Sequence, residues 1–193
     1  HMGDKLLLDD DRLFPLETNA RQIARDLYRD VKDLPIVSPH GHTDPRWFAE
    51  NKAFPNPAEL FVTPDHYVFR MLHSQGIALE NLGVPRVDGG AIEQDPRKIW
   101  KLFASNYHLL RGTPSRMWLD YAFLNTFGVT DRLSADSADA IYDQIDDCLN
   151  RPEFRPRALF DQFNIEAIAT TEGPLDDLRW HKMIRDSDWN GNV

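Results

Sequence analysis

Apolar residues near the start of the chain follow a helical spacing and then change to a strand-like run. Between residues 19 and 33 they recur at i, i+3, i+4 and i+7. This pattern predicts an amphipathic helix that packs on another part of the protein, with Thr18 as its capping residue. Leu34-Pro35 ends the pattern, and the apolar run that follows predicts a strand over Ile36–His40.

The long region after this strand carries repeated signals for the start of a helix. A polar residue followed by proline recurs there. The polar side chain accepts a backbone N–H, and proline suits the first helical position. Glycines follow at the expected helix ends. These signals predict helices near 45–51, 57–62, 64–75, 96–111, 114–127, 137–150 and 155–162, with a loop over 83–95.

Strand character returns late in the chain. The apolar run over 165–171 predicts a second strand, and a Gly-Pro turn then leads into a helix over about 175–187. The segment Asn190–Val193 has the character of a turn that feeds a third strand.

This order of elements predicts an α/β fold that opens a (β/α)₈ barrel and carries an all-helical insertion after its first strand. Such a barrel typically takes about 250 residues, so we expect the chain to be the N-terminal part of a longer protein. The expected divisions are 1–44 for the first helix and barrel strand, 45–163 for the insertion, and 164–193 for the second strand and its helix. The alternative is a small helical fold that carries a two-stranded piece.

Composition narrows the classes of function. The chain has 193 residues, of which 41% are hydrophobic, enough for one sizeable core with an appended subdomain. Its 31 acidic and 22 basic residues give a net charge of −9, which argues against a nucleic-acid binder and a polybasic membrane tether. A small anionic substrate still fits, because one local arginine can bind it. Cys148 is the single cysteine, so we expect neither an internal disulfide nor a cysteine-based zinc site.

The sequence also carries no signal for a membrane or for export. No apolar run approaches the roughly 18–20 residues of a membrane span. No signal segment opens the chain, and His1-Met2 has the character of a cloning scar. We therefore expect a cytoplasmic protein, and we expect it to form a homo-oligomer.

The first candidate for chemistry is His40-Gly41-His42, which lies at the end of the first predicted strand. Residues i and i+2 of a strand face the same side, roughly 7 Å apart along it. The two imidazoles are therefore placed to converge on one zinc-like ion, with Gly41 adding no bulk between them. The alternative is a pair of loop histidines satisfied by hydrogen bonds. Thr170, Thr171 and Glu172 lie at the carboxyl end of the second predicted strand, where ligands bind in parallel α/β folds.

The second candidate is the segment Thr63–Arg70. If Thr63 caps the helix, His66 and Tyr67 lie in its first turn, and Arg70 shares a face with both. An arginine fork binds a carboxylate through two hydrogen bonds, and a tyrosine hydroxyl beside it transfers a proton. The alternative is a solvent-facing Arg70 and a Tyr67 that is half-buried in a helix packing face.

The other polar residues have a structural interpretation. Three histidines have no partner pattern and are expected at the surface or in hydrogen bonds between helices: His73, His108 and His181. Three aspartates of one predicted helix are expected to form a solvated acidic face: Asp143, Asp146 and Asp147. Cys148 falls on the apolar face of that helix and is expected to be buried.

Taken together, these motifs resemble the glucuronate (uronate) isomerase family of the amidohydrolase superfamily. The resemblance covers nearly the whole chain. It rests on the segments Pro39–Pro45 and Asp65–Arg70, on Arg111-Gly112-Thr113-Pro114 with Trp118, and on Asn164–Pro174. A His-x-His motif alone marks only the superfamily, whereas the downstream Asp-His-Tyr-x-x-Arg block is far more specific.

The resemblance implies a distorted (β/α)₈ barrel with a helical insertion after strand one. It implies reversible conversion of D-glucuronate to D-fructuronate and of D-galacturonate to D-tagaturonate through an enediol. His40 and His42 would bind a divalent metal, zinc or alternatively manganese, which orients the sugar acid and polarises its oxygens. Tyr67 would move the proton as the catalytic residue, while His66 and Arg70 would bind the substrate.

The resemblance also implies that part of the site lies elsewhere. The remaining metal ligand of the family, an aspartate after the last barrel strand, has no counterpart in this sequence, and Glu172 stands where many members carry aspartate. We therefore expect this chain by itself to be inactive. Two other functions remain open: a metal-dependent hydrolase of the same superfamily, and a non-catalytic helical interaction module.

Overall fold

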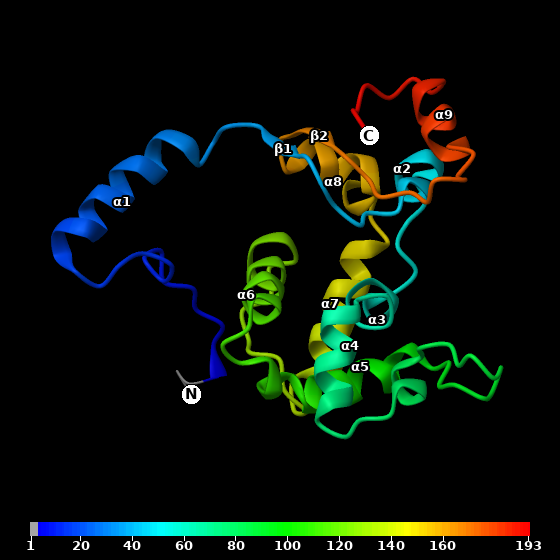
Figure 1. The fold of residues 1–193 in the computed structure, drawn as a ribbon. Helices are drawn as coiled ribbons and strands as arrows, with labels where there is room; N and C mark the ends of the chain where they lie inside the picture. Colours follow the sequence, from blue (N-terminus) through cyan, green and yellow to red (C-terminus); the bar gives the residue numbers. More distant parts are fainter. Residues whose placement is uncertain (1–3) are drawn as a thin grey trace. The chain divides into compact units, whose positions relative to one another are not determined.

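The computed structural model describes residues 4–193, so the interpretation of His1 and Met2 lies outside the described range. The α-helices are α1 Thr18–Val31, α2 Pro45–Glu50, α3 Pro57–Phe61, α4 His66–Ser74, α5 Pro96–Ser105, α6 Pro114–Tyr121, α7 Ala138–Leu149, α8 Pro156–Gln162 and α9 Arg179–Arg185 (Figure 1). Short 3-10 turns lie at Leu79–Leu82, Tyr107–Leu110 and Pro152–Phe154, and a π-helical turn at Ala122–Thr126. The strands are β1 Ile36–Ser38 and β2 Ile165–Ile168.

The chain folds as two compact units. The sheet unit comprises Asp9–Ala53 and Arg151–Val193, and the helical unit comprises Phe54–Asn150 together with the described residues up to Leu8. None of the helices between residues 4 and 193 has the length and apolar character that a bilayer crossing requires.

In the sheet unit, strands β1 and β2 lie side by side and pair in parallel (Figure 1). The Ile168 N–H donates to the Asn192 carbonyl at 2.9 Å, while the Ala169 N–H donates to the Ser38 carbonyl at 2.8 Å. Successive N–H groups of a strand point to opposite sides, so β2 is paired along both of its edges. The expected third strand thus has its first parallel bridge, between Ala167 and Asn192.

Within the sheet unit, α2, α8 and α9 contribute to one core that contains several aromatic side chains. Phe48 stacks on Trp189 with ring centres 5.6 Å apart, and Phe160 meets Trp189 edge-on at 4.9 Å. Ile184 of α9 is buried in the same cluster. The Arg157 side chain of α8 donates to the Phe48 carbonyl at 2.8 Å, which ties the end of α2 to the start of α8.

The core of the helical unit is also aromatic. Trp100 is fully buried and contacts Phe103, Phe123 and Tyr142 with ring centres 5.4 to 6.2 Å apart. Its indole N–H donates to the Ala138 carbonyl at 3.0 Å, so its polar atom is satisfied inside the core. This bond also joins α5 to the first turn of α7.

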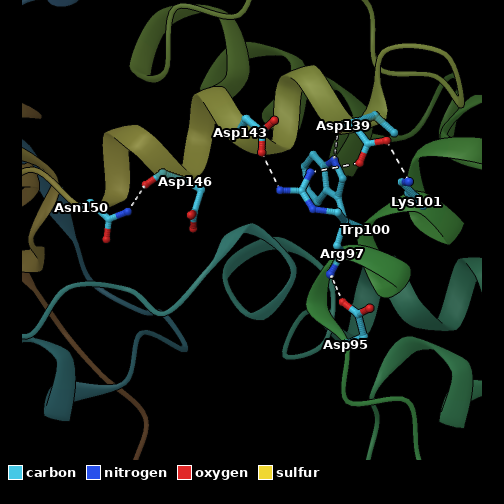
Figure 2. Close-up of polar contacts among 9 residues, drawn as sticks. Asp95, Arg97, Trp100, Lys101, Asp139, Asp143, Asp146 and Asn150 are labelled. Atoms are coloured by element: carbon cyan, nitrogen blue, oxygen red, sulfur yellow. Dashed lines mark hydrogen bonds and ion pairs between the residues drawn. The ribbon is translucent and has the colours of Figure 1, made fainter.

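Ion pairs between α5 and α7 border this core (Figure 2). Arg97 donates to Asp139 at 3.0 Å and to Asp143 at 2.5 Å, and Lys101 contacts Asp139 at 2.8 Å. The hydrogen bonds from Lys101 and Arg97 lower the pKa of Asp139. Asp146, by contrast, is half-buried, and burial together with nearby Asp147 raises its pKa. The acidic face expected to be solvated is therefore partly neutralised by basic side chains of α5. Cys148 of the same helix is buried as expected.

This pairing predicts acid-sensitive stability. The lowered pKa of Asp139 means that its pairs stabilise the fold above the unfolded carboxyl pKa of about 3.9, and that this contribution is lost as the pH falls below it. Asp139→Asn is expected to lower the free energy of unfolding near neutral pH. Urea titrations should show that the difference in free energy of unfolding between variant and parent shrinks below about pH 5 and vanishes toward about pH 2. Asp136→Asn removes an exposed carboxylate outside the network and is the control. A difference that stays constant with pH would contradict the prediction.

Several expected element boundaries were wrong, because side chains bond the backbone locally. Glu17, not Thr18, caps α1, since its carboxylate accepts from the Asn19 and Ala20 N–H groups at 3.0 and 2.7 Å. The helix expected over 175–187 begins only at Arg179. Before it, Asp176 and Asp177 accept from the Leu178 and Arg179 N–H groups.

Within residues 4–193 the apolar face of α1 is only partly covered: Tyr28 meets Phe14 edge-on, with ring centres 5.8 Å apart. No residue of this helix is buried, and its apolar residues Ile23, Leu27 and Tyr28 are 60%, 64% and 53% exposed. The helix expected over 96–111 is divided. Asn106 ends α5 by donating from its side chain to the Leu102 carbonyl at 2.8 Å, and a 3-10 turn follows.

Candidate functional site

His40 and His42 lie between β1 and α2. The strand ends at Ser38 and not at His40 as predicted, so neither histidine belongs to it. Pro39 has no N–H with which to extend a strand ladder. Both side chains are exposed, and their ring centres are 5.1 Å apart with perpendicular planes. Imidazoles that share a tetrahedral zinc-like ion, each nitrogen at about 2.0–2.1 Å, have ring centres roughly 5 Å apart. The spacing of the pair therefore fits two ligands of one metal.

The donor set around this pair consists of the two imidazoles. Within the part of the chain that the structure describes, no group of three or more His, Cys, Asp or Glu side chains could hold a metal ion. Imidazole is a common ligand for zinc and other divalent transition metals. The pair thus has a chemistry that suits such a metal, and it would supply two of the four ligands of a tetrahedral site.

The backbone on both sides fixes the turn that carries the histidines. On its carboxyl side, Asp44 caps α2 by accepting from the Arg46 N–H at 2.9 Å, and Pro45 occupies the first helical position. On its other side, the Thr171 hydroxyl donates to the Gly41 carbonyl at 2.8 Å. The turn is therefore anchored by the segment that follows β2.

A second polar cluster lies beyond the end of β2, which stops at Ile168 and not at 171 as predicted. The Thr170 hydroxyl donates to Glu172 at 2.6 Å and lies 2.8 Å from Nε2 of His181. Because its single proton goes to Glu172, Thr170 accepts from Nε2–H of His181. His181 also lies 3.6 Å from the Glu172 carboxylate. The expectation that His181 has no partner pattern was wrong, because its partners come from a segment eleven residues earlier.

The predicted substrate residues lie at the start of α4 in the helical unit. Asp65, not Thr63, caps this helix and accepts from the Tyr67 and Val68 N–H groups at 2.9 and 3.2 Å. Thr63 instead donates its hydroxyl proton to the Leu82 carbonyl at 2.7 Å. Tyr67 is therefore the second residue of the helix, and a charged cap fixes its backbone.

The side chains of Tyr67 and Arg70 in this group are exposed to solvent. Tyr67 is 60% exposed, so it does not belong to a helix packing face. Its ring packs on His66, with centres 4.2 Å apart and planes inclined by 34°. Arg70 is exposed one helical turn further on. Between residues 4 and 193, neither the Tyr67 hydroxyl nor the Arg70 guanidinium forms a hydrogen bond or ion pair.

The predicted residues thus form two groups. His40 and His42 are brought together in the sheet unit, and His66, Tyr67 and Arg70 share the first turns of α4 in the helical unit. The sequence pattern missed the hydrogen bonds of Thr171 and His181. The other histidines behave as expected: His108 is exposed, and His73 bonds the Ile77 carbonyl at 3.1 Å.

The segment Arg111–Pro114 has a structural role. Gly112 adopts a φ of +77°, which favours glycine, and Thr113 caps α6 by accepting from the Arg116 N–H. Arg116 then lies over the Tyr107 ring at 4.1 Å and bonds Asp120 at 3.0 Å. Burial, with Asp120 beside it, raises the pKa of the Tyr107 phenol far above its ordinary value, so this tyrosine stays protonated.

Comparison with known proteins places these residues in a family. A family model described as glucuronate isomerase matches residues 11–193. The uronate isomerase of Mesorhizobium japonicum is 60% identical over 187 residues, which is 97% of this chain and 40% of that protein. The chain thus spans about 40% of the length of the curated relatives it matches.

Solved structures give the same result. The crystal structure of glucuronate isomerase from Caulobacter crescentus has a TM-score of 0.93 and 52% identity, covering 98% of this chain and 39% of that one. The crystal structure of uronate isomerase from Thermotoga maritima has a TM-score of 0.82 and 25% identity, covering 97% of this chain and 38% of that one.

Proposed function

The chain belongs to the glucuronate isomerase family, and we propose that it is the N-terminal part of a uronate isomerase. The enzyme would interconvert D-glucuronate with D-fructuronate and D-galacturonate with D-tagaturonate. The observation that carries this proposal is the family match over residues 11–193, which includes both the His40–His42 pair and the Asp65–Arg70 block. Because the chain spans only about 40% of its relatives, the activity is proposed for the longer protein.

In this proposal β1, β2 and the strand that begins near Asn192 open a distorted (β/α)₈ barrel. The support is the parallel pairing of β2 along both of its edges, which is the arrangement of a strand inside a barrel. Residues 1–44 and 164–193 would belong to the barrel, and 45–163 to a helical insertion. The compactness of Phe54–Asn150 supports the insertion.

His40 and His42 are proposed to bind a divalent metal ion, zinc or alternatively manganese. The support is the fit of their 5.1 Å ring separation and the suitability of imidazole as a ligand for zinc and similar divalent metals. The remaining ligand would come from the longer protein, because no third suitable side chain is grouped with them in the described range. When bound, the metal would polarise the oxygens of the sugar acid and orient it.

Tyr67 is proposed to carry the proton. In the forward direction, C2 loses a proton and the carbonyl oxygen on C1 gains one, which gives the enediol. The O2 hydroxyl then loses its proton and C1 gains one, which gives the ketose. The exposed Tyr67 hydroxyl, which no group between residues 4 and 193 binds, would donate its proton to the C1 oxygen and then, as the phenolate, accept the proton of O2. A base in the longer protein would take the proton from C2 and return it to C1.

His66 and Arg70 are proposed to hold the substrate. Arg70 carries a planar fork that matches a carboxylate, the group that distinguishes a uronate from a neutral sugar. The His66 ring lies against the Tyr67 ring and would restrict its rotation. The capping bonds of Asp65 would hold this turn of α4 in place.

One assay separates this proposal from its alternatives. The longer protein, with its metal content measured, is incubated with D-glucuronate, and the products are followed by proton NMR. Formation of the ketose supports the isomerase. Bound metal without ketose, but with cleavage of ester, amide or phosphoester test substrates, would favour a hydrolase. Absence of both metal and turnover would favour an interaction module.

A further inference from the structure

We propose that Thr171 is a positioning residue for the His40–His42 pair: its hydroxyl holds the Gly41 carbonyl and thereby sets the separation of the two imidazoles. This inference rests on the proposed metal site and assigns to it a side chain that does not itself bind the metal. Thr171 lies 130 residues from Gly41 in the chain, so the link joins two distant segments of the sheet unit.

The acceptor, the Gly41 carbonyl, lies where one hydrogen bond can fix the orientation of the peptide group next to His42. The Gly41 carbonyl belongs to the planar peptide group that also contains the nitrogen and Cα of His42. Fixing this oxygen therefore fixes the plane from which the His42 side chain projects. The bond is 2.8 Å long, the usual length for a hydroxyl donor.

The chain segment that carries the donor, Thr171, is held by hydrogen bonds to β1 and to α9. Toward β2, the Ala169 N–H donates to the Ser38 carbonyl at 2.8 Å, which extends the ladder with β1 to within two residues of Thr171. The adjacent Thr170 bonds Glu172 at 2.6 Å and His181 at 2.8 Å, which ties the segment to α9. Thr171 therefore acts from a segment whose neighbours are fixed, and its β-branched side chain has few rotamers to lose.

Two further contacts of the turn can be compared with this bond. The Ser38 hydroxyl lies 3.4 Å from the His40 carbonyl, at the long end of the hydrogen-bonding range. A Cβ at position 41 would lie 3.6 Å from the Ala169 carbonyl, an ordinary van der Waals contact, so a side chain there would not clash with β2. The hydrogen bond from Thr171, at 2.8 Å, is shorter than the contact from Ser38 and joins the turn to a distant segment of the chain.

The test measures zinc affinity directly, in the longer protein and without substrate. Metal-free protein is titrated with zinc in competition with a chromophoric chelator. Thr171→Val and Thr171→Ala, which both lack the hydroxyl, are expected to bind zinc about 10-fold more weakly than the parent, as is typical when a residue that orients a ligand is lost. Thr171→Ser retains the hydroxyl and should restore the parent affinity. Thr130→Val, an exposed threonine in the helical unit, is the matched control and should leave the affinity unchanged.

The outcomes separate this inference from the proposed function. If the parent binds zinc and both hydroxyl-free variants bind it equally well, Thr171 has no positioning role. If Thr171→Ser is as weak as Thr171→Val, the effect comes from packing and the inference is also wrong. If the parent binds no divalent metal, the proposed metal site fails, and the inference fails with it. A thermal melt of each variant shows whether the change is confined to the metal site.

Discussion

Replacement of His40 by alanine is expected to abolish stoichiometric metal binding by the longer protein and to lower its turnover of D-glucuronate by about 1,000-fold. His40 and His42 are the two metal ligands proposed within the described residues, and their ring centres lie 5.1 Å apart. Removal of one leaves a single imidazole in this part of the site. The polarisation that a metal supplies amounts to several kcal/mol, and each 1.36 kcal/mol is a factor of ten in rate.

Metal analysis after exhaustive dialysis, combined with a ketose assay, measures both effects. His108→Ala removes an exposed histidine of the helical unit and serves as the matched control, with metal content and turnover at the parent level. A His40→Ala protein that keeps its metal and its turnover would remove the pair from the site.

Tyr67→Phe is expected to lower kcat by about 100- to 10,000-fold while leaving the metal content unchanged, because a positioned proton-transfer group contributes a factor of this size. The substitution removes only the hydroxyl. The ring can keep its contact with His66 at 4.2 Å, and the Asp65 cap bonds the backbone and not the side chain. The loss should therefore appear in the chemical step and not in folding.

Steady-state kinetics with D-glucuronate, together with metal analysis, tests this prediction. Tyr121→Phe removes the hydroxyl of another exposed tyrosine, which is 53% exposed, and should behave as the parent. Equal kcat values for the Tyr67→Phe protein and the parent would exclude Tyr67 from the mechanism. A loss of metal in the Tyr67→Phe protein would instead indicate a structural role.

The sequence predicts the starts of helices well where an Asx-Pro pair supplies both the cap and the first residue. Helices α2, α3 and α5 begin at Pro45, Pro57 and Pro96, each capped by the residue before the proline. The same rule fails for α4. Thr63 gives its hydroxyl to Leu82, a residue that local sequence does not place nearby. A cap that depends on neighbouring residues can be recognised in the sequence. A competing hydrogen bond to a residue that is distant in the chain cannot.

The candidate site shows the same limit. The His-x-His and Asp-His-Tyr-x-x-Arg patterns could be found because each group lies within a few residues of chain. The first strand ends at Ser38, two residues before the predicted end at His40, although Pro39 already indicates that end. The bonds of Thr171 to Gly41 and of Thr170 to His181 depend on folding, and no periodicity predicts them.

The most direct test of the central claim is to approach equilibrium from both sides. The longer metal-bound protein is incubated separately with D-glucuronate and with D-fructuronate, and both mixtures are followed by proton NMR until they stop changing. A reversible aldose–ketose isomerase must bring both mixtures to the same ratio of the two sugars, without added cofactor or any third product. Conversion in one direction only, a hydrolysed product, or no conversion in either mixture would contradict the claim.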